Sequence, residues 1–157
     1  MKIREAEERD VSKIIHMMRD FAKFEKLEKY FEAEDRHLMP VLFGPQAYVE
    51  ALVAEHGGKY AGYALFYPNY ASFRGQKGYY LEDLYVAAEF RGSGLGEAFL
   101  RHIARKGADR GFYRIDFQVL EWNTPAIGFY EKLGALRDET ERHFKFTDEA
   151  FAHLAEG

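Results

Sequence analysis

A glycine-rich turn at residues 91–96 (RGSGLG) contains residue types that are suited to binding a phosphate group. Its three glycines leave successive backbone N–H groups uncovered by side chains. A helical pattern begins near Leu95, and a helix N-terminus attracts anions, while Arg91 adds a planar cation. The spacing therefore predicts a phosphate-binding corner. The alternative is an ordinary strand-to-helix turn with a solvated arginine.

Two common phosphate-binding loops do not fit this turn. A P-loop needs a lysine directly after its last glycine, whereas Gly96 is followed by Glu97. A dinucleotide-binding loop needs its third glycine at the sixth position, which is again Glu97 when counted from Gly92. The turn therefore argues against an NTPase and against a dinucleotide-dependent enzyme.

The pattern Arg-Gly-x-Gly-x-Gly between a strand and a helix resembles the pyrophosphate-binding loop of the GCN5-related N-acetyltransferases (GNAT). The order of elements is similar to that superfamily over nearly the whole chain. Three segments, residues 22–25 (AKFE), 80–86 (YLEDLYV) and 121–130 (EWNTPAIGFY), resemble the diamine (spermidine/spermine) and thialysine N-acetyltransferase branch. The resemblance implies acetyl-CoA as the co-substrate.

The resemblance also implies where acetyl-CoA is held. Pantetheine carries two amides, so the exposed backbone of a strand can bind it like an added strand if the neighbouring strands splay apart. The expected cofactor contacts are Leu84, Tyr85 and Val86 on the strand, Arg91, Gly92, Ser93, Gly94, Leu95, Gly96 and Glu97 in the loop, and Asn123, Thr124, Pro125 and Ala126 at the start of a later helix.

Two side chains are expected to move protons. An alkylammonium with a pKa of roughly 10 is almost fully protonated near pH 7, so a group must take its proton. Glu82 resembles the acidic position of the diamine branch and is the candidate general base, directly or through a water. Tyr130 matches the family's acid, which protonates the leaving thiolate. The alternatives are a structural salt bridge for Glu82 and a core position for Tyr130.

Glu82 and Asp83 are neighbours on the predicted strand at residues 79–87. Successive side chains of a regular strand point to opposite faces, so at most one of the two carboxylates aims into a site unless a bulge intervenes.

The resemblance implies an acceptor site near the end of the first helix and on a later strand. Carboxylates in such a site suit a cationic amine, although scattered acids are more often solvated surface residues. The expected substrate contacts are Phe24, Glu25, Glu82, Asp116, Phe117 and Gln118.

We therefore expect direct acetyl transfer to a primary amine of a small molecule, of the polyamine, diamine or thialysine type. An acetyl-enzyme is not expected, because the sequence has no cysteine nucleophile. Two alternatives stay open: a protein lysine or N-terminal acetyltransferase, and a non-catalytic acyl-CoA-binding module. Similar enzymes are dimers, so a homodimer is expected.

The composition narrows the function classes. The 157 residues suit a single N-acetyltransferase domain over 1–157, and the net charge of −4 argues against a nucleic-acid partner. The six histidines show no close ligand spacing, so no metal is expected. The absence of cysteine, of a leader-like N-terminus and of a long apolar run favours the cytoplasm and gives no sign of a membrane partner.

The elements that position these residues form a predicted α+β domain with the GNAT acyl-CoA N-acyltransferase fold. We expect a mixed, mainly antiparallel sheet of about seven strands with splayed central strands and flanking helices. The expected strands are 2–6, 48–55, 60–67, 79–87, 113–119, 135–138 and 142–146. The first expected helix follows Asp10, which would be its N-cap. The other expected helices are 34–43, 95–106, 124–133 and the tail from 147.

Overall fold

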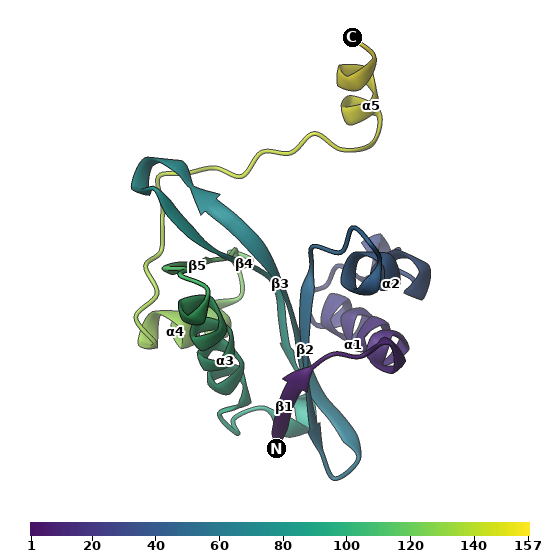
Figure 1. The fold of residues 1–157 in the computed structure, drawn as a ribbon, viewed down its shortest axis with the longest axis vertical. Helices are drawn as coiled ribbons and strands as arrows, with labels where there is room; N and C mark the ends of the chain where they lie inside the picture. Colours follow the sequence, from purple (N-terminus) through teal and green to yellow (C-terminus); the bar gives the residue numbers. More distant parts are fainter. The chain divides into compact units, whose positions relative to one another are not determined.

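A computed structural model describes residues 1–157 and divides the chain into two compact units, Met1–Gln118 and Val119–Gly157. The first unit contains one five-stranded sheet and three α-helices (Figure 1). The strands are β1 (Lys2–Glu5), β2 (Glu50–His56), β3 (Lys59–Ala71), β4 (Gln76–Val86) and β5 (Arg114–Asp116). The helices are α1 (Val11–Phe24), α2 (Asp35–Phe43) and α3 (Leu95–Asp109).

The sheet follows chain order from β1 to β5, and only the β4–β5 ladder is parallel. The prediction of a mixed, mainly antiparallel sheet with flanking helices is therefore confirmed. The predicted number of about seven strands is wrong, because residues 135–138 and 142–146 form no ladder. β5 is also shorter than predicted, since only Arg114–Asp116 pairs with β4.

The two faces of the sheet bury two separate cores, as the alternation along β3 requires. Tyr63 and Leu65 pack with the buried face of α1. Ala64 and Phe66 pack on the opposite face with Phe99 and other buried residues of α3. Helices α1 and α2 accordingly lie on one side of the sheet and α3 on the other (Figure 1).

Helix α3 continues past the predicted stop at Gly107. A Cβ at that position would lie 3.4 Å from the side chains of Tyr79 and Phe112, so the glycine sits where the helix approaches the aromatic core closely. The helix ends only at Asp109, before Gly111 with its positive φ of 74°. The predicted helix over 34–43 is confirmed as α2, with Pro40 inside it.

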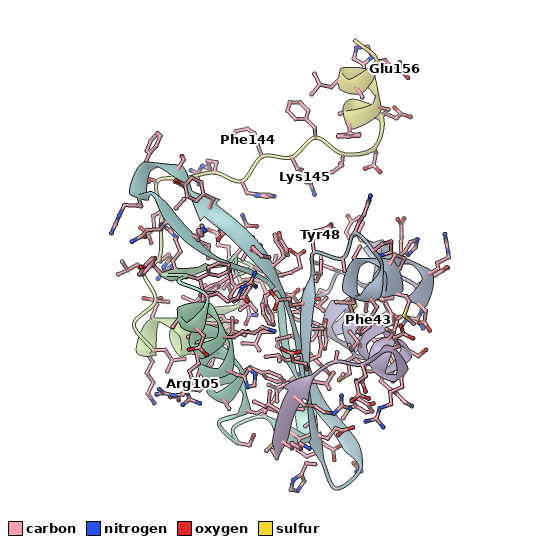
Figure 2. The ribbon with its side chains drawn as sticks, viewed as in Figure 1. Phe43, Tyr48, Arg105, Phe144, Lys145 and Glu156 are labelled. Atoms are coloured by element: carbon pink, nitrogen blue, oxygen red, sulfur yellow. The ribbon has the colours of Figure 1, made fainter.

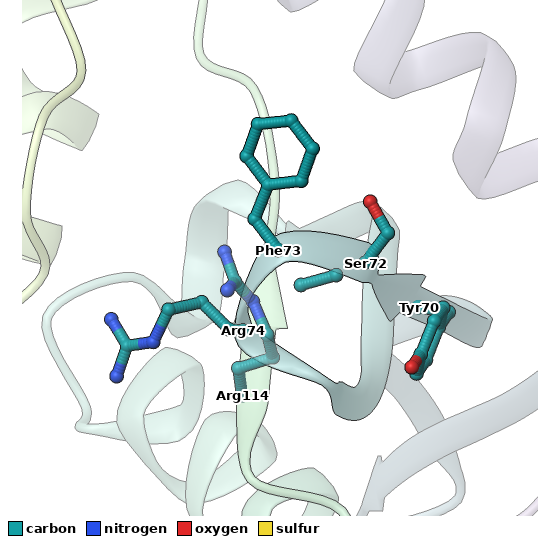
Figure 3. Close-up of a pocket in the computed structure, with 6 residues that line it drawn as sticks. Tyr70, Ser72, Phe73, Arg74 and Arg114 are labelled. Carbon is teal, nitrogen blue, oxygen red and sulfur yellow. The ribbon is translucent and has the colours of Figure 1, made fainter.

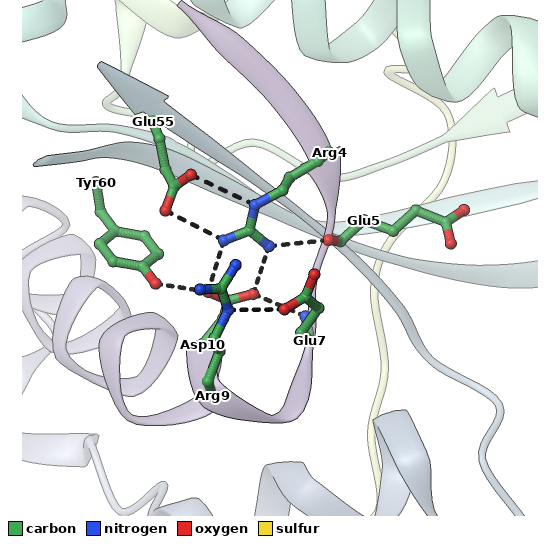
Figure 4. Close-up of polar contacts among 7 residues, drawn as sticks. All are labelled: Arg4, Glu5, Glu7, Arg9, Asp10, Glu55 and Tyr60. Carbon is green, nitrogen blue, oxygen red and sulfur yellow. Dashed lines mark hydrogen bonds and ion pairs between the residues drawn. The ribbon is translucent and has the colours of Figure 1, made fainter. Parts of the chain in front are cut away.

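Asp10 does not cap α1 with its side chain, contrary to the prediction. Its fully buried carboxylate instead accepts hydrogen bonds from the Arg4 guanidinium (2.7 and 2.9 Å), the Glu7 N–H (2.7 Å) and the Tyr60 hydroxyl (2.5 Å) (Figure 4). Arg4 also pairs with Glu55 at 3.1 Å. Burial alone would raise the pKa of Asp10, but the hydrogen bonds from Arg4, Glu7 and Tyr60 outweigh it and hold that pKa well below its usual value. This network ties β1, β2, β3 and the start of α1 together.

The second unit contains α4 (Thr124–Lys132) and α5 (Asp148–Glu156), which confirm the predicted helices over 124–133 and in the tail. Between them, residues 135–147 form an extended segment without a strand ladder (Figure 1). Leu136 and Phe144 are 97% and 87% exposed there. Neither unit holds a helix with the length and apolarity needed to span a bilayer.

The buried Asp10 pair predicts a pH-dependent stability. Asp10→Asn removes the charge that balances Arg4, so the free energy of unfolding at pH 7 should fall by roughly 3 kcal/mol. The folded-state pKa of Asp10 lies below the unfolded value, so this stabilisation is present above the unfolded pKa and is lost as the pH falls below about 4. Urea unfolding at several pH values should therefore show a shallower acid dependence in the variant.

Arg9→Ala is the control for this prediction, because the Arg9–Glu7 ion pair is exposed. Its effect on the free energy of unfolding should stay below about 1 kcal/mol. Equal stabilities of wild type and Asp10→Asn would contradict the structural role of this network.

Candidate active site

Strand β4 has an open edge where the sequence predicts the cofactor. It pairs with β5 only over Gly78–Tyr80, so the two strands diverge after Tyr80. The Ala87 N–H donates to the Ala61 carbonyl at 2.9 Å, so Ala87 directs its N–H toward β3. Backbone groups alternate in direction along an antiparallel strand, so those of the preceding residue, Val86, point away from β3. By the same alternation, the N–H and C=O groups of Leu84 lie at the open edge, where a pantetheine chain can pair like an added strand.

The glycine turn forms an open cradle before α3. Gly92 and Gly94 have φ angles of 75° and 84°, and a Cβ at either position would meet no atom within 4 Å. The first N–H groups of α3 have no acceptor within the helix and carry the positive end of its dipole. Ser93 Oγ donates to the Phe90 carbonyl at 2.6 Å, which holds the turn. The cradle thus has the space and the donors that a diphosphate needs.

Arg91 links this cradle to the end of α1. Its Nε donates to the Val86 carbonyl at 3.0 Å, and its guanidinium lies 4.5 Å from the Phe24 ring centroid and 6.0 Å from that of Tyr85. Phe24 and Glu25 are at the end of α1, where the sequence predicts the acceptor. The Arg91 side chain therefore joins the predicted cofactor and acceptor sites, and a contact with phosphate stays a prediction.

A β-bulge sits at Glu82. Leu65 is opposite Asp83 and Phe66 is opposite Leu81, which leaves Glu82 as the extra residue of β4. The Tyr63 hydroxyl donates to Asp83 Oδ2 at 2.9 Å, and the Tyr67 hydroxyl donates to Glu82 Oε2 at 3.4 Å.

The two tyrosines are four residues apart on β3, so they share one face of the sheet, and both carboxylates reach that face. In a regular strand, Asp83 would point away from Glu82. Asp83 is therefore a candidate site residue that the sequence analysis did not include, because the sequence carries no signal for the bulge.

These carboxylates create a negative potential near the end of α1. Burial raises the pKa of Asp83 to about 6, against the hydrogen bond from Tyr63, and the charges of Glu82 and Glu25 raise it further. Burial also raises the pKa of Glu25. Burial, followed by the Glu82 charge, raises the pKa of Tyr67 to about 12, so Tyr67 remains a hydrogen-bond donor. A cation is the ligand charge that this arrangement favours.

The other predicted acceptor residues have different surroundings. Asp116 on β5 is bound by Arg114 through two 2.7 Å hydrogen bonds and by Asn69 at 3.2 Å, and the Arg114 hydrogen bonds lower its pKa. Phe117 is half-buried and Gln118 is exposed. The structure thus brings Glu82 and Glu25 into one electrostatic cluster with Asp83, while Asp116 is already neutralised by Arg114. Substrate contact by Asp116, Phe117 and Gln118 stays a prediction.

The remaining predicted residues belong to the second unit. Asn123 caps α4, because its Oδ1 accepts from the Ala126 N–H at 3.3 Å, and Pro125 lies in the first turn. Tyr130 is half-buried, with its ring centroid 5.0 Å from that of Phe129. The cofactor contacts of residues 123–126 and the acid role of Tyr130 stay predictions.

A different hollow of about 360 Å³ lies at the tip of the β3–β4 hairpin (Figure 3). It is lined by Tyr70, Ala71, Ser72, Phe73, Arg74 and Arg114. Its lining holds no carboxylate that could take a proton from an amine.

Comparison with known proteins agrees with this geometry. Residues 13–135 match the acetyltransferase (GNAT) family. The chain belongs to this family. A thialysine N-epsilon-acetyltransferase from Sus scrofa is 36% identical to this GNAT chain over 165 aligned positions, which cover 98% of this chain and 96% of that protein.

Solved structures show the same fold. An integron cassette protein from the mobile metagenome of V. cholerae has a TM-score of 0.82 at 20% identity. The alignment covers 99% of this chain and 98% of that protein. An aminoglycoside acetyltransferase from an uncultured soil metagenomic sample, in complex with sisomicin, has a TM-score of 0.77 at 22% identity. The alignment covers 94% of this chain and 96% of that protein. The GNAT family and fold, and with them an N-acetyltransferase enzyme, are therefore established for this chain.

The cradle predicts a selective effect of Gly94→Ala on CoA binding. The new methyl group would enter the open space of the turn at a φ of 84°, where L-residues are strained. We expect the dissociation constant for CoA, measured by calorimetry, to rise at least ~10-fold, which is about 1.4 kcal/mol. Gly58→Ala is a matched control, with a φ of 77° and an equally open Cβ position in the β2–β3 turn. Equal affinities of the two variants would contradict the cradle.

Proposed function

We propose that the protein is an acetyl-CoA-dependent N-acetyltransferase that transfers the acetyl group directly to a primary amine of a small molecule, of the diamine, polyamine or thialysine type. The observation that carries this proposal is the bulge in β4, which turns Glu82 and Asp83 to one face beside the open edge at Leu84 and Val86. The similarity to a thialysine N-epsilon-acetyltransferase over nearly the full length supports the same class of acceptor.

The proposed chemistry uses groups of this chain at three points. Acetyl-CoA, when bound, supplies an activated thioester. Glu82 is exposed and meets the ammonium group, whose proton it takes directly or through a water. The Val86 N–H at the open edge donates to the acetyl carbonyl oxygen as negative charge develops on it. Tyr130 protonates the thiolate that leaves.

We also propose that residues 1–157 act as a single N-acetyltransferase domain located in the cytoplasm. The family match over residues 13–135 supports one domain, because it extends past the end of the first compact unit at Gln118. The absence of cysteine supports a reducing compartment.

A panel of acceptors tests the function. CoA release from acetyl-CoA should be fastest with short primary diamines, polyamines or thialysine, because each presents an ammonium group that the Glu25, Glu82 and Asp83 carboxylates attract. Preference for lysine-containing or N-terminal peptides would point to a protein acetyltransferase. Tight CoA binding without turnover of any amine would point to a binding module and overturn the enzymatic proposal.

Tyr130→Phe tests the proposed role of Tyr130 as the acid that protonates the leaving thiolate. Removal of the hydroxyl should lower kcat by ~10²-fold while CoA affinity stays unchanged, because the group acts only on the leaving thiolate. Tyr70→Phe is the control, since Tyr70 is an exposed tyrosine of the hairpin. A wild-type kcat in Tyr130→Phe would remove the acid assignment.

We further propose a homodimer in which residues 142–146 of one copy pair with the second copy. This segment is extended and has no ladder, and apolar Phe144 and Phe146 alternate with polar neighbours as in a half-buried strand. Figure 2 shows Phe144 and Lys145 projecting from the segment. An extended segment with exposed aromatic residues is a surface that a second chain can complete.

Light scattering tests the dimer. The wild-type mass should be twice the chain mass of 18.3 kDa, and Phe144→Glu should shift the protein toward monomer by placing a charge in the pairing segment. Tyr30→Glu, at an exposed position of the first unit, should keep the wild-type mass. A monomeric wild type at micromolar concentration would contradict the proposal.

A further inference from the structure

Each carboxylate of the bulge has its own phenol donor on β3. Tyr63 holds Asp83 at 2.9 Å, and Tyr67 holds Glu82 at 3.4 Å. Without the bulge, the strand alternation would allow only one such pair on this face. The arrangement therefore fixes the directions of two neighbouring carboxylates independently of each other.

The two pairs differ in their access to solvent. Tyr63 is fully buried and Asp83 is half-buried, whereas Glu82 is exposed. Tyr67 is half-buried and stacks on Tyr80 at a centroid distance of 5.4 Å. An incoming ammonium group thus meets Glu82 first, and Asp83 lies deeper, toward the α1 side of the sheet.

We infer that Asp83 is the terminal proton acceptor of the reaction and that Tyr63 is its positioning residue. The inference rests on the proposed function. The ammonium N–H bond breaks with its electron pair left on nitrogen, and an O–H bond forms on Glu82. The proton then moves from Glu82 to Asp83, directly or through a water. Glu82 is thereby ionised again. Asp83 releases its proton to solvent water before Glu82 meets the next ammonium group.

The electrostatics of the cluster support this direction of transfer. A carboxylic acid with a pKa of about 6, raised mainly by burial, retains a proton closer to neutral pH than an ordinary carboxyl group does. The charged and titratable groups around Asp83 are Tyr63 on β3, Glu82 and Tyr85 on β4, and Glu25 after α1. Asp20 of α1 and Arg91 act on Tyr85. Arg91 is the only cation of this set.

The test is the acid limb of the pH profile of kcat/KM, measured with the best amine of the panel. Tyr63→Phe removes a hydrogen bond to the ionised carboxylate, so the pKa of Asp83 should rise and the limb should move up by about one pH unit. Tyr70→Phe is the control, since Tyr70 is an exposed tyrosine of the same strand, and it should leave the limb near that of wild type. The substrate amine titrates identically in all proteins, so differences report the enzyme.

Asp83→Asn should abolish this limb and lower kcat/KM by ~10²-fold, while CoA affinity by calorimetry stays unchanged. Equal limbs in Tyr63→Phe and Tyr70→Phe, or a retained limb in Asp83→Asn, would overturn the inference.

A readout without turnover separates this inference from the proposed function. Carboxyl-carbon NMR of wild type labelled at aspartate should show a resonance that titrates near pH 6 and is missing in Asp83→Asn. A wild-type enzyme whose Asp83 resonance titrates near pH 4 would overturn the inference even if amines are acetylated. A resonance near pH 6 without any acetylation would instead count against the proposed function.

Discussion

The arrangement of the site depends on one constraint, namely that β4 pairs with β5 over only three residues, Gly78–Tyr80. Beyond Tyr80, the strand keeps its ladder with β3 but loses its neighbour on the other side. On that side the Val86 carbonyl accepts a hydrogen bond from Arg91. Backbone groups of the open edge that have no protein partner need water or a ligand. A single strand thus combines a rigid side, held by β3, with a side that is free to bind.

The bulge changes which side chains of β4 point to each face of the sheet. It lies between the paired part of β4 and the open edge, so the two carboxylates of the cluster occur where the strand changes its surroundings. The extra residue reverses the alternation for the part of β4 that precedes it, and Tyr80 therefore shares the face of Tyr67, on which it stacks. The proposed acid–base groups and the proposed cofactor contacts of β4 then belong to one continuous segment, whose geometry the β3 ladder maintains.

The sequence allowed the glycine turn before α3 and the helix beginning at Thr124 to be predicted, because glycine-rich turns and Asn-x-Pro before a helix have strong local preferences. It did not reveal the bulge, since alternation looks the same until the register with β3 is known. Asp10 was misjudged because its partners, Arg4 and Tyr60, come from other strands. Residues 142–146 were wrongly predicted to join the sheet. Their alternating pattern indicates which side chains would be buried, but it does not indicate which strand would pair with them.

The position of Arg91 has a mechanical consequence. One guanidinium group hydrogen-bonds the last carbonyl of β4 and covers the Phe24 ring, so the turn and the first helix share a rigid link. A shift of the turn must either break that hydrogen bond or carry the aromatic ring with it. Any motion of the glycine turn therefore reaches Phe24 at the end of α1 through a single side chain.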